Sequence, residues 1–140
     1  MISRLLATID RLSAPPVAAA HCDLPCGVYD PAQALIEAES VKACQQKYQD
    51  SDDPVFQGRA VGIKEERADL VKHHLWVLWT DYFKPPHLEK YPELHQLIWD
   101  ATKAAGAAKK SEDPESGQKL LDLIAEIDKI FWETKGGKPA

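Results

Sequence analysis

The stretch DPESGQKLLDLIAEIDKIFWET, from Asp113 to Thr134, carries the clearest information about the fold. Apolar residues recur in it every three or four positions, at Leu120, Ile124, Ile127 and Phe131. This spacing places their side chains on one face of an α-helix. Asp113 can cap the first turn, where Pro114 also fits because its missing N–H has no helical partner. The stretch therefore predicts an amphipathic helix over residues 114–134 whose apolar face requires partner helices.

Three more helices are predicted, over residues 31–49, 54–83 and 92–110. The first two begin at Asp-Pro pairs like the one at residue 113, and the third follows the sequence Tyr-Pro-Glu at residues 91–93. A Lys-Pro-Pro loop at residues 84–86 should end the second helix, because the residue before a proline disfavours the helical conformation.

The predicted helices can bury their apolar faces against one another. The third has its own stripe, formed by Leu94, Leu97, Ile98, Ala101, Ala105 and Ala108. No strand-like alternation competes with the helical pattern, and the connecting loops are short. The sequence therefore predicts an all-α protein, with an up-and-down four-helix bundle over residues 31–134. Gly58 and Gly62 weaken the expectation that the second helix is continuous.

Composition narrows the class of protein. The chain has 140 residues, of which 44% are hydrophobic and 28% charged, values ordinary for one globular domain. Its net charge of −5 argues against a nucleic-acid partner, because phosphate binding draws on a basic surface. No apolar run is long enough to suggest a membrane span. The glycine-rich tail at residues 135–140 is expected to be flexible.

The three cysteines, Cys22, Cys26 and Cys44, do not form an even disulfide framework. A reducing compartment, or capture of thiols by a metal, fits this odd number better. Cys44 lies three residues after Val41 in the first predicted helix, so we expect it to be a small core residue and not a ligand.

Residues 1–20 have the pattern of a leader that is removed. Apolar residues at helical spacing come first, and a run of small residues ends at Ala18-Ala19-Ala20. Asp10 and Arg11 interrupt the apolar stretch, which is then too short for an ordinary signal-peptide core. We therefore favour a propeptide removed by a processing peptidase in the cytoplasm. The alternative is an export signal, because the alanines resemble a signal-peptidase site.

Residues 21–30, HCDLPCGVYD, follow these alanines and form a compact metal-binding segment, the hook. Cleavage after Ala20 would give His21 a free amine beside its imidazole. The thiolates of Cys22 and Cys26 and the Cys22 amide nitrogen complete a nitrogen and sulfur donor set. Such a set suits a square-planar metal, nickel or copper, and the segment has too few side chains for a structural zinc site.

The hook and the start of the first helix, HCDLPCGVYDP at residues 21–31, resemble the metal-binding hook of the nickel-containing superoxide dismutases. The similarity continues through IEAESVKA at 36–43, IKEERA at 63–68, KHH at 72–74, DYFKPPH at 81–87, YPELHQL at 91–97 and IDKIFWET at 127–134. The resemblance implies dismutation of superoxide to oxygen and hydrogen peroxide by Ni(II)/Ni(III) cycling at the mature N-terminus. It also implies a homohexamer.

The resemblance further assigns roles to individual residues. Nickel would be held in a plane by the His21 amine, the Cys22 amide and the sulfurs of Cys22 and Cys26, with the His21 imidazole joining in the oxidised state. The family has a cis bond at the position of Pro25, where the sequence alone predicts only a turn.

The same resemblance implies supporting residues around the metal. Glu37 would hydrogen-bond the imidazole, and Arg67 would support that contact. Tyr29 and Tyr82 would border the open face of the metal, and Asp23 would stabilise the turn of the hook. Two other functions remain open from the sequence: a nickel or copper carrier, and a helical interaction module without enzymatic activity in which Cys22 and Cys26 form a disulfide.

Overall fold

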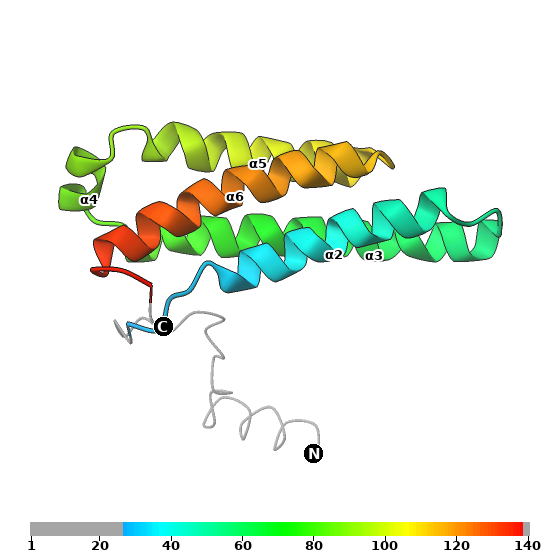
Figure 1. The fold of residues 1–140 in the computed structure, drawn as a ribbon, viewed down its shortest axis with the longest axis horizontal. Helices are drawn as coiled ribbons and strands as arrows, with labels where there is room; N and C mark the ends of the chain where they lie inside the picture. The colour runs from blue at the N-terminus through cyan, green and yellow to red at the C-terminus, as the bar shows by residue number, and fades with distance from the viewer. Residues whose placement is uncertain (1–26, 139–140) are drawn as a thin grey trace, which may run out of the picture.

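The computed structural model describes residues 27–138, and its regular structure over this range is entirely helical (Figure 1). The elements in chain order are α2 (Ala32–Gln49), α3 (Pro54–Val77), the π-helical turn η1 (Leu78–Tyr82), α4 (Pro85–Lys90), α5 (Leu94–Lys110) and α6 (Pro114–Thr134). The long helices α2, α3, α5 and α6 run antiparallel to their chain neighbours. Each packs against two others, α2 against α3 and α6, and α5 against the same pair. The predicted all-α, up-and-down four-helix bundle is confirmed.

The predicted helix starts are also confirmed, to within two residues. The carboxylates of Asp53 and Asp113 accept hydrogen bonds from the N–H groups of Val55 and Glu115, both at 3.0 Å. Asp30 accepts one from the N–H of Ala32 at 2.8 Å. These contacts satisfy N–H groups that have no partner within the helix.

The segment between the second and third long helices differs from the prediction. Instead of a simple loop, it contains the short helix α4, whose first two residues are the prolines of the Lys-Pro-Pro sequence. These prolines end the preceding helix as expected, and they also fit the first turn of a new one. Helix α3 passes through Gly58 and Gly62 without a break, and both glycines face open space.

Both predicted apolar stripes lie in the core. Leu120, Ile124, Ile127 and Phe131 of α6 are fully buried, as are Leu94, Ile98, Ala101, Ala105 and Ala108 of α5, whereas Leu97 is half-buried. The small alanine side chains let the neighbouring helices approach α5 closely. No helix between residues 27 and 138 is both long enough and apolar enough to span a bilayer.

The core position after Val41 belongs to Gln45, and the prediction that Cys44 is a core residue is wrong. Cys44 is only half-buried, because the buried face of α2 continues at the fourth residue after Val41. The amide of Gln45 is fully buried and donates to the carbonyl oxygens of Ala108 and Ser111, at 3.2 and 3.0 Å.

Lys64 of α3 is buried beside Gln45, with only 1% of its side chain exposed. Its ammonium donates to the Ser111 carbonyl at 2.8 Å and to the Glu112 carboxylate at 2.7 Å. Burial of a charge is unfavourable unless the charge is paired and hydrogen-bonded, and both conditions are met here. Gln45, Lys64, Ser111 and Glu112 form a polar cluster, which ties the turn between α5 and α6 to α2 and α3.

Two Gly→Ala substitutions, one beside this cluster and one at an open position of α3, should have opposite effects on stability. A Cβ at Gly117 would lie 2.5 Å from Gln45 Oε1 and 2.9 Å from Lys42 Cα, so Gly117→Ala should destabilise the fold by about 1–3 kcal/mol. Gly58→Ala meets open space and should stabilise it by about 0.5–1 kcal/mol. Urea unfolding measures both. Equal effects of the two substitutions would contradict this packing.

The half-buried Cys44 predicts a pH-dependent reactivity. Desolvation raises the pKa of its thiol above the ordinary value, although the charges of Lys47, Arg67 and Lys64 oppose this effect. Alkylation requires the thiolate, so the pH midpoint of the Cys44 alkylation rate should be higher in the folded protein than in urea. The stability contributed by the neutral thiol is complete below the unfolded pKa and is lost as pH rises through the folded pKa. Mass spectrometry of the Cys44 peptide measures the alkylation rate at each pH. Equal midpoints in the folded protein and in urea would refute the prediction.

Candidate metal centre

The predicted nickel ligands His21, Cys22 and Cys26 lie outside the described residues, as do Asp23, Pro25 and the leader. The described chain begins at Gly27, directly after Cys26. Gly27 has a φ of 72°, in the left-handed region that favours glycine. Glycine at this position lets the backbone adopt this conformation without the strain that a Cβ would cause.

Residues 27–31 reach the bundle at the end where η1, α4 and the last turn of α6 meet (Figure 1). We call this the hook end. Tyr29 precedes α2 and packs against Tyr82 of η1, with 5.6 Å between the ring centroids and 51° between the ring planes. The two tyrosines predicted to border the metal are thus brought together from segments far apart in the sequence.

Tyr82 also contacts residues of α4 and α6. Its ring lies 4.5 Å from that of the buried Phe131, measured between centroids, and stacks on the imidazole of His87 at 5.7 Å. Its hydroxyl lies 2.6 Å from Thr134 Oγ1. The Thr134 hydroxyl donates its hydrogen bond to the Phe131 carbonyl, also at 2.6 Å. The Tyr82 hydroxyl is therefore the donor in its bond with Thr134.

The π-helical turn places Tyr82 at this position. In η1 the N–H of Phe83 bonds to the carbonyl of Leu78 at 3.0 Å, a spacing of five residues. Such a turn inserts an extra residue relative to an α-helix and rotates the side chains that follow it. Single π turns are often found at functional sites.

A small hollow lies beside Tyr29, between residues 28–33 and the last turns of α3. Its volume is about 90 Å³, and its lining residues are Val28, Tyr29, Asp30, Gln33, His74, Val77 and Leu78. The hollow is large enough to hold water, because its volume exceeds the minimum that one water molecule needs.

Glu37 of α2 and Arg67 of α3 form the second predicted pair. Arg67 Nη1 lies 3.3 and 3.5 Å from the two carboxylate oxygens of Glu37, both longer than the usual distance for a charge-assisted bond. Arg67 Nη2 makes a shorter bond, 3.0 Å, to Glu66. Arg67 Nε is buried and has no hydrogen-bond partner among the described residues. The Glu37 side chain, 16% exposed, thus retains hydrogen-bonding capacity beyond its contact with Arg67.

The described residues alone supply no metal site. Between residues 27 and 138, no group of three or more His, Cys, Asp or Glu side chains is placed to hold an ion. The donor set predicted for nickel, in the hook, lies outside the described residues. This set has thiolate and nitrogen donors, and Glu37 is available to bond an imidazole.

Sequence reasoning missed Thr134 and Lys135 at the hook end. Both follow the last apolar residue of the α6 stripe, and no local pattern signals that they contact residues 29 and 82. The amphipathic pattern did identify Phe131 as a core residue, but it contained no information on which aromatic ring would pack against it.

Comparisons with known proteins agree with this geometry. Residues 16–135 match the family of nickel-containing superoxide dismutases. The chain is 70% identical over 128 residues to the superoxide dismutase [Ni] of Streptomyces coelicolor and 69% identical to that of Streptomyces seoulensis. In both cases the match covers 91% of this chain and 98% of the relative.

Solved structures match as closely. A native nickel superoxide dismutase, 73% identical, superimposes with a TM-score of 0.80 over 82% of this chain and 99% of its own. Another, with nickel ligation corresponding to the oxidised state, is 70% identical, with a TM-score of 0.81 over 84% of this chain and 100% of its own. Agreement in sequence and fold over most of its length places this chain in the nickel-containing superoxide dismutase family.

Proposed function

We propose that the protein dismutes superoxide, converting two superoxide anions and two protons to one molecule of oxygen and one of hydrogen peroxide. The observation that carries this proposal is the match of residues 16–135, the hook included, to a family whose relatives are named for this activity. The paired Tyr29 and Tyr82 rings, next to the point where the hook joins the bundle, support it.

The hook residues would hold one nickel ion. The His21 amine, the Cys22 amide nitrogen and the sulfurs of Cys22 and Cys26 are the proposed ligands, and the His21 imidazole is a fifth. When bound, nickel supplies the redox chemistry by alternating between its divalent and trivalent states. The thiolates and the deprotonated amide matter because strong electron donors stabilise the higher state.

Residues of the bundle would control access to the hook. The packed rings of Tyr29 and Tyr82 would cover one side of the metal, and the hollow beside Tyr29 would be a path for a small anion. Thiolates are oxidised by peroxide when they are accessible, so restricted access protects Cys22 and Cys26. Asp23 would stabilise the turn of the hook through hydrogen bonds.

Glu37 and Arg67 would orient the His21 imidazole. Glu37 lies in the second turn of α2, about 9 Å along the helix axis from Pro31 at 1.5 Å per residue. The six residues from His21 to Cys26 can span at most about 20 Å when extended, so His21 can reach this level of the bundle. Glu37 would accept a hydrogen bond from the imidazole N–H, and Arg67 would hold the carboxylate.

Assembly and maturation complete the proposal. Large apolar side chains are exposed on the single chain, among them Val28 (81%), Ile36 (59%) and Trp76 (46%), as expected if other subunits cover them in a homohexamer. A peptidase would remove residues 1–20 in the cytoplasm, and the alternative is removal during export.

Removal of the leader predicts that activity depends on cleavage between Ala20 and His21. A peptide bond there replaces the amine ligand with a poorly donating amide, so the uncut 140-residue chain should be inactive. Mass spectrometry of the N-terminus, together with nickel analysis and a superoxide assay, tests this on natively produced protein. Full activity in nickel-loaded protein that keeps Met1 would refute the proposed ligand set.

The position of Glu37 predicts a loss of turnover without a loss of metal. Glu37→Ala leaves the four planar ligands intact, so nickel should stay bound while turnover falls by about 10- to 100-fold, the usual range for a residue that orients a ligand. Glu66→Ala is the matched control, because Glu66 pairs with the same arginine but is 65% exposed. It should leave turnover unchanged. Nickel content, turnover and the paramagnetic signal of oxidised nickel are measured for both.

These variants also separate the enzyme from a nickel or copper carrier. A carrier would tolerate Glu37→Ala, because the planar ligands suffice to hold the metal. Equal turnover in the two variants would therefore contradict the role of Glu37, and loss of all nickel in Glu37→Ala would mean that Glu37 organises the hook itself.

A further inference from the structure

The turn after α6 fixes the backbone of Lys135 at the hook end. Lys135 is the C-cap residue of α6. The next two residues, Gly136 and Gly137, have φ angles of 86° and 120°, which favour glycine. The N–H of Gly137 bonds to the Trp132 carbonyl at 2.8 Å and closes the turn. The start of the Lys135 side chain is therefore set by the end of the helix.

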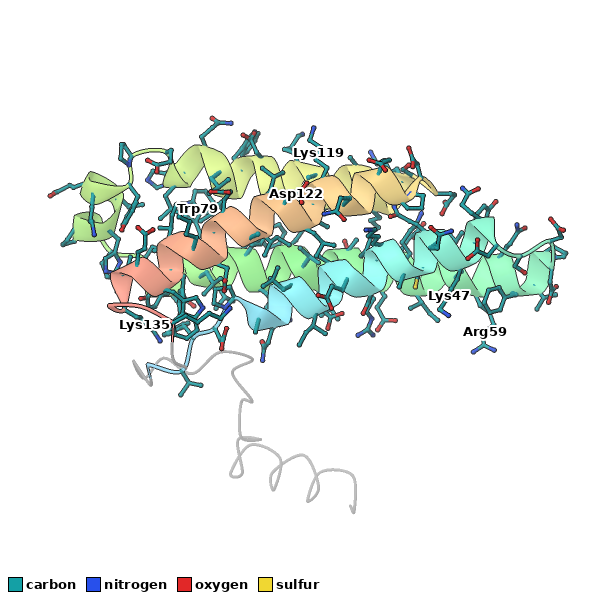
Figure 2. The ribbon with its side chains drawn as sticks, in the orientation of Figure 1. Lys47, Arg59, Trp79, Lys119, Asp122 and Lys135 are labelled. Carbon is teal, nitrogen blue, oxygen red and sulfur yellow. The ribbon has the colours of Figure 1, made fainter. Side chains whose placement is uncertain are left out.

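The Lys135 side chain connects this helix end to the segment that follows the hook (Figure 2). Its Nζ lies 4.8 Å from the ring centroid of Phe131 and 5.5 Å from that of Tyr82, within the range of cation–π contacts. The same Nζ donates a long hydrogen bond, 3.4 Å, to the carbonyl oxygen of Tyr29. One ammonium thus bridges a rigid aromatic platform and the backbone of residue 29.

We propose that Lys135 is a positioning residue that fixes the backbone at Tyr29 and, through it, the exit of the hook. Tyr29 lies three residues after Cys26, so movement of its backbone is transmitted to the chain that carries the second sulfur ligand. The rings of Phe131 and Tyr82 can hold the ammonium in place, because Phe131 is fully buried and the Tyr82 hydroxyl is bonded to Thr134. The consequence for nickel rests on the proposed ligand set, whereas the effect on residues 27–31 does not.

A cation at this position could instead act only by attracting superoxide. Lys138 provides the matched control, because it carries the same charge three residues later. It pairs with Asp128 at 3.3 Å and lies 6.0 Å from the Trp132 ring centroid. Removal of either charge would weaken long-range attraction to a similar degree, but only Lys135 bonds to the Tyr29 carbonyl.

The test compares Lys135→Met, Lys135→Arg and Lys138→Met in the full processed protein. Hydrogen–deuterium exchange in the metal-free form reports on the backbone of residues 27–34. Lys135→Met should speed exchange there by about 3-fold, comparable to the loss of one exposed cation–π contact. Lys135→Arg should restore the slower exchange, and Lys138→Met should leave it unchanged. Exchange in α3 and α5 should be the same in all variants.

Nickel release and the salt dependence of kcat/KM provide the second readout. Of the three variants, only Lys135→Met should release nickel faster, by about 3-fold. This matches the expected increase in hydrogen–deuterium exchange at residues 27–34. Unchanged exchange at residues 27–34, with an equal fall in kcat/KM for Lys135→Met and Lys138→Met at low salt, would overturn the proposal in favour of charge attraction. Faster exchange throughout α3 and α5 would overturn it in favour of general stability. Faster exchange confined to residues 27–34 with unchanged nickel release would support the fixing of Tyr29 and contradict its transmission to the hook.

Discussion

The antiparallel packing of α2 between α3 and α6 is the constraint on which the hook end depends. Each of these helices must bury one apolar face, and the short turns between chain neighbours force alternating directions. As a result α2 begins where α3 and α6 end. Lys135 and Tyr29 are 106 residues apart in sequence, yet they touch because of this arrangement. The surroundings of residues 27–31 thus come from the topology of the bundle, and not from residues near them in sequence.

The two ends of the bundle are stabilised by different interactions. At the far end, Gln45 and Lys64 bond to the turn between α5 and α6, so a buried amide and a buried charge hold that turn in place. At the hook end, aromatic rings pack around Tyr82. The polar cluster fixes the position of the start of α6. Because α6 is one continuous helix, the position of its start also determines the position of Thr134 at its end. The placement of residues beside the hook therefore depends partly on contacts at the opposite end of the molecule.

Much of the fold follows from helical periodicity and capping. Because these signals are local, the four long helices, the Asp-Pro starts and the buried stripes of α5 and α6 could all be predicted. Helix α4 was missed because prolines that end one helix can also begin another. Gln45 and Cys44 are adjacent in α2, and only the position four residues after Val41 faces the core. Choosing the more apolar of the two residues therefore gives the wrong one. Lys64 was not foreseen as a buried residue, because its partners lie in a turn 47 and 48 residues away.

For the candidate site, the residue types in the hook indicate a nickel or copper chelate, and family resemblance supplies the roles of Glu37, Arg67 and the two tyrosines. The contacts of Thr134 and Lys135 could not be predicted, because they arise only when α6 is placed beside η1. The long Arg67–Glu37 distances also required a structure, since a sequence can place two side chains on facing helices but cannot set the geometry of their contact.

The location of both ends of the described chain, beside the hook end, has a practical consequence for electrochemistry. A linker close to residue 27 or residue 138 would crowd the region through which, on the proposed function, superoxide would reach the metal. The turn at residues 111–113 precedes the 21-residue helix α6, so it lies at the other end of the bundle, where the polar cluster joins it to the core. Attachment of a single subunit to an electrode through this turn would orient the hook end toward the solution.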